Sequence, residues 1–119
     1  MQHPLLASLR IPERGKVVSA REAVSLIRDG DTVATSGFVG TGFAEGIAIA
    51  IEELFLEPDA GSDPHPLDKP CNLTLVYAAG QGDGKNRGLN HLGHEGLVKR
   101  VIGGHWGLVP ALGKLAVEN

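Results

Sequence analysis

Three short runs of strand-forming residues, each followed directly by a cluster of glycines, constrain the fold of this chain more than any other feature. The runs occupy residues 32–36, 73–77 and 98–102, and helical patterns separate them. β-Branched and aromatic residues favour strands, whereas clustered glycines interrupt regular structure. An alternation of strands and helices is typical of a parallel sheet. The sequence therefore predicts an α/β fold: an open, mainly parallel sheet with flanking helices and three converging glycine-rich loops at the strand C-terminal ends.

The segments around these runs show helical spacing. Ser19 and Glu22 stand at the spacing of a capping box, in which the serine hydroxyl accepts a hydrogen bond from the Glu22 amide. The apolar residues after Ala44 recur at helical spacing and leave little polar surface, so we expect this helix to be mostly buried. The expected helices cover residues 20–27, 44–56 and 89–97, and a further helical segment begins near residue 109.

Two segments show neither pattern. Residues 1–15 have mixed polarity and are expected to form an irregular lead-in, while residues 57–70 contain four prolines and are expected to form a surface excursion. The rest of residues 16–119 makes one small domain. A three-stranded sheet has two exposed edges and little core, so we expect the chain to be part of a longer protein.

Charge and hydropathy exclude several classes of function. The net charge is −3 and the basic residues are scattered, so nothing supports nucleic-acid binding. The longest apolar run, residues 47–51, is far shorter than the ~20 residues that span a bilayer, and no membrane association is expected. The single cysteine, Cys71, excludes an internal disulfide framework and fits a reducing compartment. We therefore expect a cytoplasmic protein.

The stretch DGDTVATSGFVGTGFAE, residues 29–45, is the leading site candidate. Ligands gather at the carboxyl ends of parallel strands, where glycines let backbone amides approach closely and a helix N-terminus favours negative charge. The nucleotide motifs fail, however. Glu45 stands where the dinucleotide fingerprint needs its third glycine, and Phe43-Ala44 stand where a P-loop needs Lys and Ser or Thr. A tight strand-to-helix turn without a ligand is the alternative.

The other two glycine clusters carry polar side chains that allow two interpretations. Gln81-Gly82-Asp83 can orient a carboxylate or a pantetheine amide, but an Asp in a glycine loop is commonly a turn residue. His105-Trp106 is either a pocket wall or an aromatic anchor of the sheet edge. The sequence leaves both pairs of interpretations open.

Catalytic groups are scarce. His91, His94, Glu95 and His105 form the only plausible metal set, but no cysteine and no H-E-x-x-H motif accompanies them, so no metal site is predicted. A metal hydrolase built on these histidines is a minor alternative. No Ser-His-Asp or Cys-His arrangement is evident, and Glu45 is equally explained by its place at a helix N-terminus.

Two blocks of the sequence resemble the N-terminal half of family I CoA-transferases, above all the single-chain acetate or propionate CoA-transferases. These blocks are residues 29–45 and NLTLVYAAGQGDGKNRGLNHLGHEGLVKRVIGGHWGLVPALGKL, so that the resemblance covers about residues 15–115 apart from the excursion. The family signature begins Asp-Gly and reaches Gly-Gly-Phe and later Gly-x-Pro. Ser36 replaces the first glycine of the pair and Ala44 the proline. The matching positions are Asp29-Gly30, Phe38 and Gly42.

The resemblance implies an incomplete alpha-type CoA-transferase domain that exchanges CoA between a short-chain acyl-CoA and a carboxylic acid. In the family, an enzyme glutamate forms an acyl anhydride and then a glutamyl-CoA thioester. That glutamate lies in the second half, and an oxyanion-related glutamine lies further along the first. Both are expected beyond Asn119, so no catalytic residue is expected here. By position, the resemblance implies these substrate-binding residues: Gly37, Phe38, Val39, Gly40, Gly42, Gly80, Gln81, Gly82, Asp83 and His105.

The same resemblance sets the expected partners. Coenzyme A is a substrate carried by the acyl-CoA, and no cofactor is expected. The expected partners are acyl-CoA, a short-chain carboxylate, the C-terminal (beta-type) half of the transferase and further copies in a homo-oligomer. The alternative is a non-catalytic remnant, or a binding module that pairs with a separate chain; the chain alone is expected to be inactive in either case.

Overall fold

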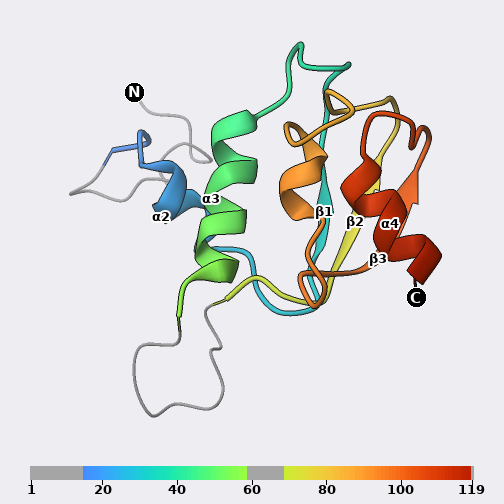
Figure 1. Ribbon diagram of the computed structural model, residues 1–119. Coiled ribbons are helices and arrows are strands. Elements are labelled where there is room, and N and C mark those ends of the chain that lie inside the picture. The colour runs from blue at the N-terminus through green and yellow to red at the C-terminus, as the bar shows by residue number, and fades with distance from the viewer. Residues whose placement is uncertain (1–14, 59–68, 119) are drawn as a thin grey trace.

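The computed structural model describes residues 15–58 and 69–118 and shows an open parallel α/β layer (Figure 1). The sheet has the order β1-β2-β3, and both pairs of neighbouring strands are parallel. The predicted fold class is therefore confirmed. The elements in chain order are α2 (Ala20–Val24), β1 (Thr32–Ala34), α3 (Glu45–Leu56), β2 (Leu73–Tyr77), the 3₁₀ helix η1 (Leu89–Leu92), β3 (Val98–Gly103) and α4 (Pro110–Glu118).

The two segments expected to be irregular fall largely outside the described residues, which omit 1–14 and 59–68. The described ends of the proline-rich excursion lie close together, because the Lys69 ammonium donates a hydrogen bond to the Glu57 carbonyl oxygen. Glu57 also pairs with Arg21 on α2. Within the described residues, no helix is both long and apolar enough to cross a membrane.

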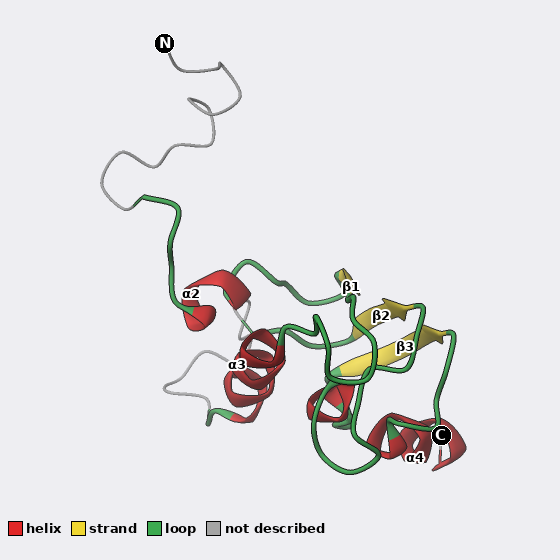
Figure 2. Ribbon diagram, turned by 90° about the horizontal axis from the view of Figure 1, so that it is seen from above, coloured by secondary structure: helices red, strands yellow, loops and turns green. Residues whose placement is uncertain are grey.

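The sheet is covered on one face by the helices that the structure describes. α3 and α4 lie on the same side of the strands (Figure 2), and η1 packs against both helices. The run at residues 73–77 is apolar except for Thr74, which predicts a strand buried on both faces of a parallel sheet. In the structure only Leu73, Leu75 and Tyr77 are fully buried, whereas Thr74 and Val76 are half-buried. The prediction of two-sided burial is wrong for the described chain because its helices leave the second face open.

Local sequence signals predict some ends of the helices correctly and others incorrectly. The Glu22 amide donates to the Ser19 hydroxyl at 3.1 Å, as the capping box predicts, but α2 ends at Val24 instead of residue 27. The helix expected over residues 89–97 is wrong: only the 3₁₀ turn η1 forms. Gly93 interrupts it and lies so close to Ala111 that an added Cβ would be 2.4 Å from the Ala111 Cβ.

The core lies between the covered sheet face and the helices. Its apolar side chains come from every layer, which ties the helices to the sheet by removing apolar surface from water. β1 contributes little to it, since Thr32 and Ala34 are exposed and Val33 is half-buried. The largest fully buried core side chains are Ile51, Leu73, Leu75, Leu89, Leu92, Leu97 and Leu112.

Candidate active site cleft

The three glycine-rich loops lie together at the carboxyl ends of the strands. The Val39 amide of the loop after β1 donates to the Gly80 carbonyl oxygen of the loop after β2 at 2.6 Å. Gly80 in turn faces the loop after β3, since an added Cβ on Gly80 would lie 2.9 Å from His105 Nδ1. The Tyr77 hydroxyl holds that third loop by donating to the His105 carbonyl oxygen at 2.8 Å. The parallel topology thus assembles one site region from three distant segments.

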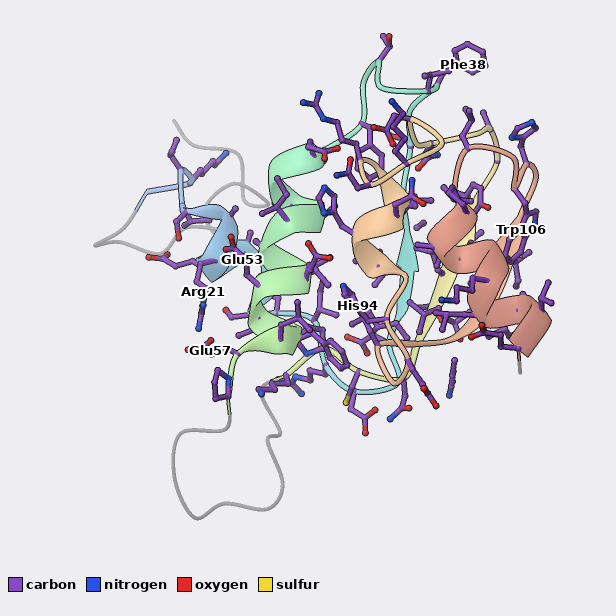
Figure 3. The ribbon with its side chains drawn as sticks, viewed as in Figure 1. Arg21, Phe38, Glu53, Glu57, His94 and Trp106 are labelled. Carbon is purple, nitrogen blue, oxygen red and sulfur yellow. The ribbon has the colours of Figure 1, made fainter. Side chains whose placement is uncertain are left out.

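The loop after β1 projects from the molecule as a tight turn. The Phe38 amide donates to the Thr41 carbonyl oxygen and the Thr41 amide to the Phe38 carbonyl oxygen, each at 2.9 Å. Val39 within this turn has φ +57°, a strained conformation for a β-branched residue. The Phe38 side chain is 67% exposed, and Figure 3 shows its ring at the outer tip of the loop. This loop therefore presents an apolar side chain and a strained backbone to its surroundings.

The loop after β2 uses its polar side chains inside the chain. Gln81 is buried, its Oε1 accepts from the Thr35 hydroxyl at 2.6 Å, and its Nε2 donates to the Thr35 carbonyl oxygen at 3.3 Å. The Asp83 Oδ1 accepts from the backbone amides of residues 85, 86 and 87. These bonds, the one from the Arg87 amide first, hold the pKa of Asp83 below its ordinary value. Both side chains are thus hydrogen-bonded within the chain, and the bonds that Asp83 accepts are those of a turn residue.

A cleft of about 560 Å³ opens between the first two loops and the N-terminal end of α3. Its lining combines the apolar side chains of Val39 and Ile49 with polar and charged side chains, among them the exposed Arg87. Such a mixture is typical of sites that bind an organic substrate with a charged end. The lining residues are Val39, Gly40, Glu45, Ile49, Gly82, Asp83, Asn86, Arg87, Gly88 and His91.

The cleft contains four of the residues expected to bind substrate: Val39, Gly40, Gly82 and Asp83. Gly42 lines a smaller, apolar cavity of about 200 Å³ between β1, α3 and η1. The other expected residues lie in the converging loops outside both cavities: Gly37, Phe38, Gly80, Gln81 and His105.

Sequence reasoning missed several cleft residues. Asn86 and Arg87 follow Asp83 in the same loop, so their position after a strand was an available signal. Ile49 looked like an ordinary apolar residue of a buried helix. The sequence marks Glu45 as a helix-end charge and His91 as a metal candidate, and their contact across 46 residues of sequence is visible only in the fold.

The chain matches known proteins of one kind. No protein-family model matches it. A caffeate CoA-transferase of Acetobacterium woodii is 38% identical over 84% of this chain, and the acetate CoA-transferase YdiF of Escherichia coli K12 is 35% identical over 92% of it. Two crystal structures of the acyl-CoA transferase YdiF from E. coli O157:H7 are also similar. The thioester complex with CoA is 33% identical over 86% of this chain with a TM-score of 0.75, and the apoenzyme is 35% identical over 92% with a TM-score of 0.77.

The chain is homologous to one part of the CoA-transferases. It spans between 17% and 20% of the length of these relatives. The resemblance seen in its glycine-rich blocks is thus confirmed, and the chain corresponds to a small portion of such an enzyme.

In this CoA-transferase homologue, one side of the cleft rests on a network of histidines and glutamates. His91 Nε2 lies 2.6 Å from Glu45 Oε1, and His91 Nδ1 lies 2.9 Å from Glu52 Oε1. The second oxygen of Glu45 accepts from the Gly88 amide at 3.1 Å. The second oxygen of Glu52 lies 2.6 Å from Nε2 of His94, the side chain labelled between α3 and the sheet in Figure 3.

This network shifts two pKa values. Partial burial lowers the pKa of His91, but the hydrogen bonds and charges of Glu52 and Glu45 outweigh burial and raise it above its ordinary value of 6.5. Partial burial raises the pKa of Glu52, but the hydrogen bonds from His94 and His91 outweigh burial and bring it below 4.5. Each shift favours the charged form of its group.

The histidines do not form the metal site that their sequence positions suggest as an alternative. His91 and His94 are both paired with Glu52, while His105 lies beside Gly80 at the end of the sheet. Among the described residues, no group of three His, Cys, Asp or Glu side chains is placed to hold a metal ion. The described arrangement thus gives the metal-hydrolase alternative no support.

Proposed function

We propose that this chain supplies one wall of the substrate cleft of an enzyme that transfers CoA between a short-chain acyl-CoA and a carboxylic acid. The observation that carries this proposal is a cleft of about 560 Å³ at the converging strand ends of a chain homologous to CoA-transferases. One of its structural neighbours is a thioester complex with CoA. The reactive glutamate would come from another part of the protein, as the family resemblance implies, and the chain spans at most 20% of the length of its relatives.

The chemistry needs a positioned acyl group more than it needs acid or base catalysis. A glutamate carboxylate attacks the thioester carbonyl and releases the CoA thiolate, giving a mixed anhydride. The thiolate then attacks the glutamyl carbonyl and releases the first carboxylate, giving glutamyl-CoA. The second carboxylic acid reverses these steps, so no proton is consumed. Backbone amides near the acyl carbon would stabilise each oxyanion, and glycines permit that close approach.

The side chains of the cleft fit such a substrate. Val39 and Ile49 offer an apolar wall for an acyl chain or a pantetheine arm. Arg87, which lines the cleft and is exposed, offers a guanidinium that pairs well with a carboxylate or phosphate oxygen. Phe38 extends the apolar surface outward, where a ligand or a neighbouring part of the enzyme would cover it.

CoA transfer from an acyl-CoA to a carboxylic acid, measured in the complete protein that contains this chain, tests the proposal. Arg87→Ala is expected to raise the KM for acyl-CoA about tenfold, the typical loss of one charge-assisted hydrogen bond. Arg28→Ala, at an exposed arginine outside the cleft, is the matched control and should leave the KM unchanged. Absence of CoA transfer rejects the function, and equal KM values for the two variants reject the assigned cleft.

A non-catalytic binding module is the second candidate. Among the described residues that line the cleft there is no serine, threonine, cysteine or lysine, and the two carboxylates, Asp83 and Glu45, both accept hydrogen bonds within the chain. Binding of an acyl-CoA with no transfer, in the complete protein, would favour this candidate over the enzyme.

A further inference from the structure

His91 is placed between two acceptors. An ionised carboxylate only accepts hydrogen bonds, and a neutral imidazole carries a single N–H. Yet both ring nitrogens of His91 lie within 2.9 Å of a carboxylate oxygen, one from Glu45 and one from Glu52. A neutral ring would satisfy one contact and direct a nitrogen lone pair at the other carboxylate. Both contacts are satisfied when both nitrogens carry a hydrogen, as in the imidazolium cation.

Glu45 links the charge state of His91 to the cleft. One oxygen of Glu45 faces His91 and the other accepts from the Gly88 amide. Gly88 closes the loop after β2, where it forms an isolated bridge with Gly82. The Leu89 amide also donates to the Gln81 carbonyl oxygen at 2.8 Å, so the base of this loop is narrow. Glu45 therefore connects the loop that walls the cleft to the first turn of α3.

We propose that His91 is held as an imidazolium cation between Glu45 and Glu52 and acts as a positioning residue for the cleft. The cation fixes the Glu45 carboxylate, which in turn fixes the Gly88 amide and the wall formed by residues 82–88. When His91 loses its proton, one carboxylate contact is lost and this wall is released from α3. Residues Glu45, Glu52, His91 and Gly88 are hereafter the cleft clasp.

The charged groups around His91 favour this state. Glu45 and Glu52 face it from α3, and His94, which follows η1, shares Glu52 with it. From the loop after β2, Asp83 and Arg87 line the same cleft. Arg87 is exposed, so water and salt screen its repulsion, whereas the His91 side chain is 16% exposed and feels the two carboxylates more strongly.

The effect of the clasp on a ligand rests on the proposed function, because the cleft that it shapes is the one assigned there to acyl-CoA. The charge of His91 and the protection of the Gly88 amide do not depend on that function. The two proposals are therefore tested by different measurements. The assay of CoA transfer tests the proposed function, and spectroscopy of the protein without substrate tests the clasp.

Nitrogen-15 NMR of the imidazole rings, recorded against pH, tests the clasp. We expect both ring nitrogens of His91 to be protonated at neutral pH, and the same ring in the urea-unfolded chain to be mostly neutral there. His91→Gln assigns the two signals by removing them. In that variant the amide-exchange protection of Gly88 should fall about tenfold, as expected for a weakened charge-assisted hydrogen bond.

Matched variants separate the clasp from a general loss of charge. Glu45→Gln should lower the Gly88 protection as His91→Gln does, whereas Glu53→Gln, at an exposed glutamate of the same helix, should leave it unchanged. A single protonated nitrogen on His91 at neutral pH overturns the proposal, and so does equal Gly88 protection in the wild-type chain and in Glu45→Gln. If His91→Gln does not fold, the titration of the wild-type protein and the comparison with Glu45→Gln still test the proposal.

Discussion

The loops after β1 and β2 are both rich in glycine, yet glycine answers a different need in each. At Gly40 an added Cβ would meet no atom within 4 Å. At Gly82 the same atom would lie 2.3 Å from the Leu108 carbonyl oxygen, and at Gly88 it would lie 2.2 Å from the Gln81 carbonyl oxygen. The first loop has room around its backbone at Gly40, whereas the second is packed against other backbone at Gly82 and Gly88 and admits no side chain at these two positions.

The side chains of the two loops also differ in burial. Phe38 of the first loop is exposed, while Gln81 of the second is buried and bonded to Thr35. Asn90, just after the second loop, is also buried and donates to the Leu108 carbonyl oxygen. The comparison teaches that similar glycine content can accompany a packed framework in one loop and an exposed turn in the other. Substitutions in the two loops should then separate stability from ligand selectivity.

Gly88→Ala is expected to have the largest effect. Gly88 has φ +68°, and the new Cβ would overlap the Gln81 carbonyl, so backbone strain and overpacking act together. We expect the free energy of unfolding to fall by about 3 kcal/mol or more, measured by urea denaturation. Gly40→Ala in the first loop is the matched control, with an expected change within about 0.5 kcal/mol. Equal losses in both loops would remove the distinction between them.

Gln81→Leu should cost somewhat less. The substitution keeps a buried apolar volume but removes both hydrogen bonds to Thr35, whose hydroxyl and carbonyl then lose a partner. We expect a loss of about 2 kcal/mol in the free energy of unfolding, the typical penalty for a polar group left unpaired. The same denaturation experiment on Thr35→Val, which keeps the side-chain shape and removes only the hydroxyl, should show a smaller loss. A larger loss for Thr35→Val than for Gln81→Leu would argue against the role of these bonds.

The cleft clasp should make stability depend on pH. Because the pKa of His91 is raised, its contribution is complete below the ordinary value of 6.5 and is lost as pH rises through the raised pKa. Because the pKa of Glu52 is lowered, its contribution is present above 4.5 and is lost as pH falls through the lowered pKa. The clasp therefore stabilises the fold most between about pH 4.5 and pH 6.5, the ordinary pKa values of Glu52 and His91.

The measurement is urea denaturation across that pH range for the wild-type chain and His91→Gln. The difference should be roughly 1 kcal/mol in the slightly acidic window, after allowance for the solvent that reaches Glu45, and should shrink toward alkaline pH. A constant difference at all pH values would mean that His91 contributes packing and no charge.

Phe38→Trp should have the smallest effect on stability, within about 0.5 kcal/mol, because the ring is exposed. In the complete protein we expect it to change the acyl-chain selectivity, measured as the ratio of kcat/KM for a longer and a shorter acyl-CoA. Leu56→Trp, at an exposed position on the far end of α3, is the control and should leave that ratio unchanged. An unchanged ratio in Phe38→Trp would place this loop outside the acyl site.

The sequence by itself determined the class of the fold and the order of its parts. Runs such as residues 73–77 carry their strand preference locally, and the glycines after them end the strands, so alternation alone predicts parallel pairing. The helix expected over residues 89–97 failed because the helical spacing was local, whereas the approach of Ala111 to Gly93 was not. Helical periodicity carries no information about a neighbour that passes so close.

Only the tertiary structure decided which polar groups are available for chemistry. The sequence left Gln81 and Asp83 between ligand binding and loop structure, and their partners show that both shape the loop. It offered Glu45 as a helix-end charge and His91 as a metal candidate, and the fold places them 2.6 Å apart instead. The physical reason is that strand and turn preferences depend on neighbouring residues, whereas a hydrogen bond or an ion pair depends on which distant segments packing brings together.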